Sequence, residues 1–244
     1  MKDTAIIIVV YNTAEFIVRQ LECVDRFCKD KYQIIIIDNS TIPEVSEVIQ
    51  YRIRETGCVY EKTQANSGDP SLSHAFAANF SYWKFKDTYD YIFYLDHDAF
   101  PIMEFSVKEI LGEKIIAGMA QTKSSGKTYI WAGCLMVNNA NIDKDIVDLA
   151  PNVEFGLDTG GNTYKIIEHY GLEKCVFFNE HYYENIHFKV PRYNFYSIIN
   201  DGMFLHFIAG SNWNKINSEE YQERMSTLMV CLGEEITKRN TTNA

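Results

Sequence analysis

The chain has 244 residues, of which 46% are hydrophobic and 23% charged, with 5 prolines and 13 glycines. These fractions exclude a disordered, collagen-like or low-complexity chain, and the length fits one large domain with a substantial core. Lysine and arginine number 23 against 33 aspartates and glutamates, giving a formal net charge of −10. An acidic chain without a basic cluster argues against nucleic-acid partners. Any phosphate-bearing ligand would therefore need a metal ion or backbone amides to offset repulsion.

The cysteine pattern and the chain start bear on location. The 6 cysteines are scattered and include no Cys-x-x-Cys pair, which favours reduced, mostly buried thiols over a disulfide framework or a zinc site. The apolar run at residues 5–10 is too short for a signal-peptide core, and no stretch of about 18 apolar residues predicts a membrane span. We expect a soluble cytoplasmic protein without a transmembrane segment, compatible with peripheral association at a membrane.

The first half alternates apolar runs with helical patterns. Strands are expected where short β-branched runs indicate burial on both faces, at residues 5–11, 33–38, 58–61 and 89–95. Helices are expected between them, at residues 14–27, from Pro43 to about residue 54, and at 71–85. Ser40 or Thr41 would cap the second helix, and Ser71 or Ser73 the third. This order predicts an α/β fold, a Rossmann-like parallel sheet with right-handed crossovers and helices on both faces.

The second half is less regular. Strands are expected at residues 114–121, 128–137, 175–178 and 203–207. A helix is expected at 159–170, ending at Gly171, and an amphipathic helix at 218–239. Because no repeat or linker appears, we expect residues 1–244 to form a single domain.

Asp96-His97-Asp98 follows the fourth predicted strand directly. In open α/β sheets, ligands bind beyond the carboxyl ends of the strands. Two carboxylates one residue apart at such an end are suited to Mg²⁺ or Mn²⁺, which bind carboxylates together with substrate phosphates. A solvated acidic turn is the structural alternative.

Four motifs in order resemble the GT-A glycosyltransferases, in particular the family-2-like enzymes. Val9-Val10-Tyr11-Asn12 is similar to the first-strand motif of that family, and the turn at residues 37–41 resembles its D-D-G-S turn, with Asn39 in the second acidic position. Asn66-Ser67-Gly68 resembles the N-x-G segment, with His74 near the position of a basic residue. Asp96-His97-Asp98 matches the D-x-D motif. The resemblance covers residues 5–213.

The resemblance implies roles for these residues. Tyr11 would stack on the nucleotide base, Asp38 would accept a hydrogen bond from it, and Asp96 would face the ribose and the metal. The other residues implied to bind the nucleotide sugar are Asn12, Asn66 and Gly68. Structural alternatives are a strand-end aromatic for Tyr11 and a helix cap for Asp38.

The implied metal ligands are Asp96, Asp98 and His206. His206 lies in a late strand ahead of the segment 210–213 (Gly-Ser-Asn-Trp), which is similar to a C-terminal segment of many GT-A enzymes. A neutral imidazole favours Mn²⁺ over Mg²⁺. A structural strand histidine is the alternative.

The general base is harder to assign because the acidic pair of the family is absent. The corresponding region is residues 154–161, and we choose Asp158 as the base that deprotonates the acceptor, with Glu154 as the second choice. Helix capping by Asp158 fits the sequence equally well.

Trp131 and the residues after it are candidates for a wall of the sugar or acceptor site. Other candidates for stacking on sugars are Tyr182, Tyr183, Tyr193 and Tyr196, with loop packing as the alternative.

Taken together, the resemblance implies a metal-dependent glycosyltransferase that moves a sugar from a nucleotide-sugar donor to a hydroxyl of a glycan or lipid-linked acceptor, inverting by a single displacement, as in polysaccharide biosynthesis. Residues 1–100 would be the nucleotide-binding half, 101–217 the acceptor side, and 218–244 a C-terminal helix and tail.

The alternatives are a non-catalytic sugar-nucleotide-binding member of the fold and a haloacid-dehalogenase-like phosphotransferase, in which Asp96 would be a nucleophile. The triplet at 158–160 also matches aspartic proteases, but that class is all-β. The chain lacks the G-x-G-x-x-G of dinucleotide-binding oxidoreductases and the Gly-rich, basic phosphate loop of nucleotidyltransferases.

Overall fold

The structure is a computed structural model that describes residues 3–63, 68–182, 196–208, 210 and 218–242. These residues form two compact units. The first unit draws on residues 1–14, 30–96 and 106–178, and the second on 15–29, 97–105 and 179–244. The unit boundaries differ from the expected divisions at residues 100 and 217, and the single-domain organisation stays a prediction.

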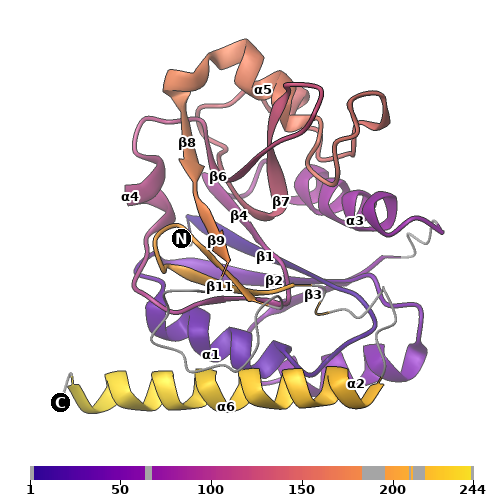
Figure 1. Ribbon diagram of the computed structural model, residues 1–244, viewed down its shortest axis with the longest axis vertical. Helices are drawn as coiled ribbons and strands as arrows, with labels where there is room; N and C mark the ends of the chain where they lie inside the picture. The colour runs from indigo at the N-terminus through magenta and orange to yellow at the C-terminus, as the bar shows by residue number, and fades with distance from the viewer. Residues whose placement is uncertain (1–2, 64–67, 183–195, 209, 211–217, 243–244) are drawn as a thin grey trace. The chain divides into compact units, whose positions relative to one another are not determined.

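A seven-stranded sheet forms the first unit, in the order β3-β2-β1-β4-β7-β6-β8 (Figure 1). Its strands are β1 (Thr4–Val10), β2 (Tyr32–Asp38), β3 (Val59–Lys62), β4 (Tyr91–Leu95), β6 (Ile116–Thr122), β7 (Thr128–Asn138) and β8 (Cys175–Phe178). β1 pairs in parallel with β2 and β4, β2 pairs in parallel with β3, and β6 pairs in parallel with β8. β7 runs antiparallel to β4 and β6. The predicted α/β fold with a mostly parallel sheet is confirmed.

The core of this unit explains the continuous apolar runs in the sequence. Every residue of β1 from Thr4 to Val10 is at most 3% exposed, as expected for a strand covered on both faces. Helix α3 (Pro70–Phe85) contacts β1 and β2, and helix α5 (Thr163–Tyr170) contacts β7. The short helix α4 (Val107–Leu111) contacts β4, β6 and β7. The helices therefore bury side chains that alternate on successive positions of the strands.

The predicted cap residues of two helices are wrong, although α2 (Pro43–Ile53) starts at Pro43 as predicted and α3 starts one residue before the predicted position. Helix α2 begins after Ile42, which makes no side-chain cap. Helix α3 begins at Pro70, and the side chain of Asp69 accepts a hydrogen bond from the backbone N–H of Leu72 at 3.0 Å. In both helices proline occupies the first turn, where its missing N–H costs nothing.

Helix α5 begins four residues later than predicted, at Thr163 instead of residue 159. Residues 159–162 form turns, and Asn162 precedes the first helical residue. The predicted end at Gly171 is confirmed: its φ of 88° lies in the left-handed region that glycine adopts without strain. The 3₁₀ turns η1 (Lys144–Ile146), η2 (Val153–Phe155) and η3 (Leu172–Lys174) connect the neighbouring elements.

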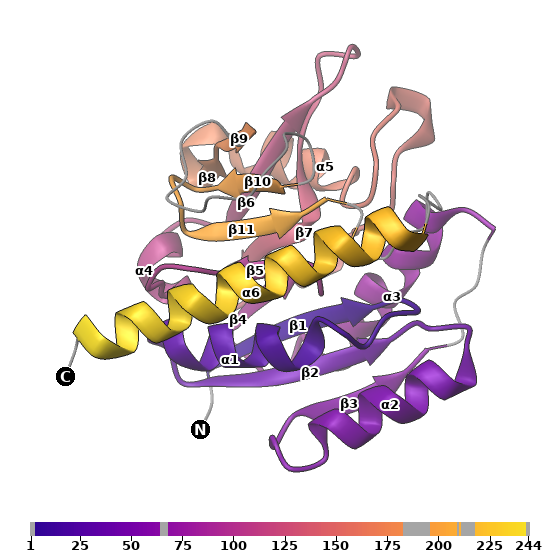
Figure 2. The ribbon, with the colours of Figure 1, turned by 60° about the horizontal axis from the view of Figure 1, so that its bottom comes forward.

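The second unit contains a four-stranded antiparallel sheet in the order β5-β11-β10-β9. Its strands are β5 (Ala99–Pro101), β9 (Glu180–Tyr182), β10 (Tyr196–Ile199) and β11 (Phe204–Phe207), and its helices are α1 (Ile17–Phe27) and α6 (Ser218–Thr242). Helix α6 lies beside α1 (Figures 1 and 2). Its predicted apolar face is confirmed, because Met225, Leu228 and Leu232 are buried. In the described part of the chain, no helix combines the length and apolarity needed to cross a membrane.

Candidate functional site

The strand order of the first unit has a topological switch point. The chain builds β1, β2 and β3 in one direction across the sheet and then places β4 on the other side of β1. Ligands of open α/β sheets bind at the carboxyl ends of the strands at such a point. Tyr11 follows β1, Asp38 ends β2 and Asp96 follows β4. Three of the predicted nucleotide-binding residues therefore lie at one edge of this sheet, and Tyr11 is half-buried there.

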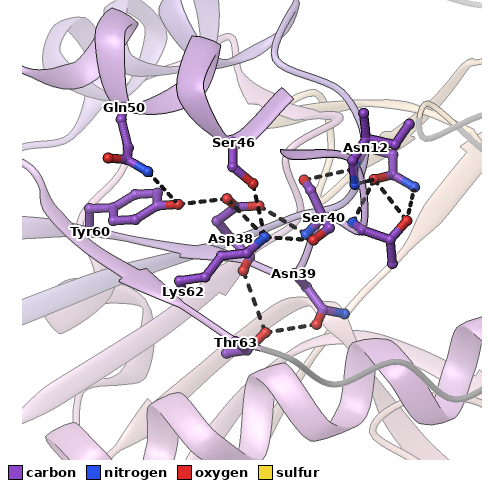
Figure 3. A network of polar contacts seen from close by, with 11 residues as sticks. Asn12, Asp38, Asn39, Ser40, Ser46, Gln50, Tyr60, Lys62 and Thr63 are labelled. Carbon is purple, nitrogen blue, oxygen red and sulfur yellow. Dashed lines mark hydrogen bonds and ion pairs between the residues drawn. The ribbon is translucent and has the colours of Figure 1, made fainter. Parts of the chain in front are cut away.

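Asp38 lies at the centre of a buried polar network (Figure 3). Its side chain is 0% exposed. One carboxylate oxygen accepts a hydrogen bond from the backbone N–H of Ser40 at 2.9 Å, and the other accepts one from the Tyr60 hydroxyl at 2.7 Å. The Lys62 ammonium lies 3.2 Å from that second oxygen. The chain itself thus supplies partners to both oxygens.

The electrostatics of this network favour the ionised carboxylate. Burial alone would raise the pKa of Asp38, but hydrogen bonds from Ser46, Tyr60 and Ser40 outweigh it and lower the pKa below the usual carboxyl value. Burial and the neighbouring Asp38 raise the pKa of Tyr60 to about 12. Because Asp38 bonds to Ser40 in the turn, it does not cap helix α2, which excludes that alternative for it.

Asn12 links the end of β1 to the turn between β2 and α2 through hydrogen bonds (Figure 3). Its Oδ1 accepts hydrogen bonds from the backbone N–H groups of Thr41 at 2.8 Å and Ile42 at 3.2 Å. Its own N–H donates to the Ser40 hydroxyl at 2.9 Å. The φ of Asn12 is 49°, a left-handed conformation that asparagine tolerates better than most residues. Ser40 and Thr41, predicted as helix caps, serve as partners of Asn12 instead.

Asn39 makes contacts that need an amide instead of the carboxylate found at this position of the turn that residues 37–41 resemble. Its amide nitrogen donates to the Ser73 hydroxyl at 2.9 Å and to the Ser73 carbonyl at 3.2 Å, and its oxygen accepts from the Thr63 hydroxyl at 2.7 Å. A carboxylate accepts but cannot donate when ionised, whereas an amide does both. Asn39 therefore joins β2 to α3 and to the residue after β3.

Asp96 is held from two directions. Its backbone N–H donates to the carbonyl of Gly133 on β7 at 2.9 Å, and one of its carboxylate oxygens lies 2.8 Å from Nε2 of His74 on α3. The side chains of His74 and Asp96 are 21% and 18% exposed. The structure thus brings together two residues that the sequence analysis had singled out separately.

Asp98 and His206 meet within the second unit. Nε2 of His206 lies 3.8 Å from a carboxylate oxygen of Asp98. The other oxygen of Asp98 accepts a hydrogen bond from the backbone N–H of Gly210 at 2.8 Å, and Nδ1 of His206 lies 3.3 Å from the Ser197 hydroxyl. Asp98 is only 5% exposed. The solvated acidic turn is therefore the wrong interpretation of Asp98.

The side chains of Asp98 and His206 are chemically suited to the predicted metal ion. A carboxylate and an imidazole that face each other form a donor pair suited to Mn²⁺. The third predicted ligand, Asp96, belongs to the other unit and contacts His74. Among the described residues, no group of three histidine, cysteine, aspartate or glutamate side chains converges as a metal centre. Asp96, Asp98 and His206 as metal ligands remain a prediction.

Asp158 lies in the loop ahead of α5 and is exposed. Its Oδ1 accepts hydrogen bonds from the backbone N–H of Thr159 at 2.7 Å and from the hydroxyl of Ser71 on α3. Because α5 begins at Thr163 after Asn162, Asp158 is not a helix cap, and that alternative is wrong. The second choice for the base, Glu154, is also exposed.

The remaining predicted site residues include an exposed glycine, a buried tyrosine and several residues outside the described part of the chain. Gly68 is exposed, and a Cβ there would meet open space. Tyr196 is only 3% exposed and stacks on Phe207 with ring centroids 5.4 Å apart, so it packs in the core as the first residue of β10 and not in a loop. Asn66, Tyr183, Tyr193 and the segment 211–213 lie outside the described residues.

Comparisons with known proteins identify the fold. No family model and no curated protein sequence matches the chain significantly. Among solved structures, the mannosyltransferase PcManGT from Pyrobaculum calidifontis, in complex with GDP-Man and Mn²⁺, matches with a TM-score of 0.52 at 11% identity, over 72% of this chain and 54% of that one. The fold is of the GT-A type. The chain thus spans about half the length of that mannosyltransferase.

A second similar structure is the glycosyltransferase GlyE of Streptococcus pneumoniae, with a TM-score of 0.47 at 16% identity, over 98% of this chain and 64% of that one. At such identities, similarity shows the fold and not the activity. The GT-A fold leaves the haloacid-dehalogenase-like interpretation of Asp96-His97-Asp98 without support.

Proposed function

We propose that this GT-A-fold protein is a glycosyltransferase that moves a sugar from a nucleotide-sugar donor to a hydroxyl of a glycan or lipid-linked acceptor. The proposal rests on the switch point between the adjacent parallel strands β1 and β4. Tyr11 and Asp96 lie at the carboxyl ends of these strands, and Asp96 contacts His74. The fold comparison supports it, because the similar structures named above are glycosyltransferases.

Donor binding is assigned to the edge of the first sheet. The Tyr11 ring would stack on the nucleotide base, and Asp96 would accept a hydrogen bond from the ribose. Asp38 is buried with both oxygens engaged, so its contribution to base recognition would come through the shape of the turn that it holds. Asn12 fixes the same turn from β1. Asn66 and Gly68 are retained as proposed donor-binding residues.

A divalent cation, Mn²⁺ or Mg²⁺, would supply positive charge to the departing nucleoside diphosphate. Asp98 and His206, whose side chains lie 3.8 Å apart, would hold it, together with Asp96. The hydrogen bond from Gly210 to Asp98 keeps one carboxylate oxygen oriented. An acidic chain of net charge −10 has a particular need for such a cation.

Asp158 would remove the proton from the acceptor hydroxyl as it attacks the anomeric carbon in a single, inverting displacement. The Ser71 hydroxyl and the Thr159 N–H both donate to Oδ1 of Asp158. Because both bonds go to Oδ1, Oδ2 would be the oxygen that receives the proton.

The decisive experiment is a donor panel. The full chain is incubated with UDP-, GDP- and dTDP-sugars in the presence of Mn²⁺, and both binding and release of the nucleoside diphosphate are measured, with and without EDTA. We expect one donor to bind and to be turned over only with the metal. Binding of a donor with no release under any condition would favour the non-catalytic alternative, and turnover unaffected by EDTA would exclude metal dependence.

A further inference from the structure

Gly133 on β7 leaves a gap that two side chains fill. A Cβ atom at this position would lie 2.1 Å from Cη2 and 2.2 Å from Cζ2 of Trp131, and 2.6 Å from a carboxylate oxygen of Asp96. Residues two apart in a strand share one face of the sheet. The six-membered ring of Trp131 therefore lies over Gly133, with the Asp96 carboxylate beside it. No side chain larger than hydrogen fits at position 133 without displacing one of them.

This arrangement is fixed by three elements of the first unit. The backbone of Asp96 is hydrogen-bonded to Gly133, and its carboxylate contacts His74 on α3. Trp131 itself comes from β7 and is half-buried. The side chains of Asp96 and His74 are 18% and 21% exposed. The indole of Trp131 and the carboxylate of Asp96 therefore both retain accessible surface.

The loop with the candidate base lies against the same stretch of β7. The N–H of Ala132 donates to the carbonyl of Thr159 at 3.3 Å, and a Cβ atom at Gly160 would lie 2.4 Å from the carbonyl of Ile130. The N–H of Ala132 and the carbonyl of Gly133 point to opposite edges of the strand. β7 is thus flanked at Trp131 by Asp96 on one edge and by the loop of Asp158 on the other.

We propose that the indole of Trp131 is the platform for the pyranose ring of the sugar being transferred, and that Gly133 is a specificity-determining position because it admits the indole. The inference rests on the proposed function. Sugar-sized sites combine an apolar surface with a few polar groups that fix orientation, and here an aromatic ring adjoins an ionisable carboxylate. The anomeric carbon of a transferred sugar must lie between the departing diphosphate and the base. Trp131 lies between Asp96, assigned to the donor, and the loop of Asp158, assigned to the base.

The test compares nucleotide with nucleotide-sugar binding. Calorimetric affinities for UDP, GDP, UDP-glucose, UDP-galactose and GDP-mannose are measured with Mn²⁺ for the full chain, and for Trp131→Ala, Trp131→Phe and Gly133→Ala. Trp83→Ala is the matched control, because Trp83 is 50% exposed on α3. Indole fluorescence provides a second readout that is specific to contact with the ring.

We expect Trp131→Ala to leave the affinity for the free nucleotide unchanged and to weaken binding of the matching nucleotide sugar by about tenfold. Trp131→Phe should restore most of the loss, and the control should match wild type. Gly133→Ala should weaken nucleotide-sugar binding at least as much as Trp131→Ala, because its Cβ displaces the indole or the Asp96 carboxylate. The extra fluorescence change caused by the sugar should vanish in Trp131→Phe.

Two results would overturn the inference. Equal losses for nucleotide and nucleotide sugar in Trp131→Phe would mean that the residue is only structural, and unchanged sugar binding in Trp131→Ala would remove the platform. Both leave the proposed function standing. Failure of the wild-type chain to bind any nucleotide would instead refute the proposed function, and this inference with it.

Discussion

Replacing Tyr60 with phenylalanine tests the buried network around Asp38. The substitution keeps the ring and removes the hydroxyl that donates to the Asp38 carboxylate at 2.7 Å. Hydrogen bonds to charged groups contribute about 1.5–3 kcal/mol. Because Ser40 and Lys62 remain as partners, we expect a loss of about 2 kcal/mol in the free energy of unfolding at pH 7. For a chain of this size that corresponds to a fall of about 4–8 °C in Tm.

The pH dependence of the free energy of unfolding provides a second test of the Asp38 network. Since the pKa of folded Asp38 is lowered, its ionised form stabilises the protein above the usual carboxyl pKa, and this contribution is lost as the pH falls through the folded pKa. Tyr60→Phe removes one of the bonds that lower that pKa. The difference in stability between wild type and variant should therefore be largest at neutral pH and should shrink as the pH falls below the ordinary carboxyl pKa.

Urea denaturation followed by circular dichroism, from pH 7 downward, measures both the loss of stability at pH 7 and its change with pH. Tyr51→Phe is the matched control, because Tyr51 is 64% exposed on α2. The reasoning fails if Tyr60→Phe is no more destabilising than the control. It also fails if the difference in stability does not change with pH.

The remaining predictions concern the proposed transfer. Tyr11→Ala should weaken nucleotide affinity by about 1–3 kcal/mol, the contribution of base–aromatic stacking, and unaltered calorimetric affinity would reject the stacking role. Asp98→Asn should abolish Mn²⁺-dependent nucleotide release yet preserve the fold, because the amide oxygen still accepts from Gly210. Full activity of this variant in EDTA would contradict the metal assignment. Asp158→Asn should slow transfer by about 10²–10⁴-fold with donor affinity unchanged, and wild-type rates would shift the base assignment to Glu154.

The sequence alone determined the architecture of the first half. Runs such as residues 5–10 and 34–37 are continuously apolar because their strands are buried on both faces, so the local sequence alone indicates this burial. The alternation of such runs with helical patterns leads to a parallel sheet. The placement of Asp96 directly after β4 followed from the same pattern, because a strand that ends in charged residues marks its own boundary.

Only the tertiary structure decided what these residues contact. Tyr60, which engages Asp38, lies 22 residues away along the chain, and their pairing depends on the register of β2 against β3. Asp98 accepts a hydrogen bond from the backbone N–H of Gly210, 112 residues later. Trp131 and Asp96 share the space above a glycine only because β7 pairs with β4. Local patterns specify elements because apolar burial repeats along the chain, whereas these contacts depend on register and on close packing between distant segments, which periodicity does not encode.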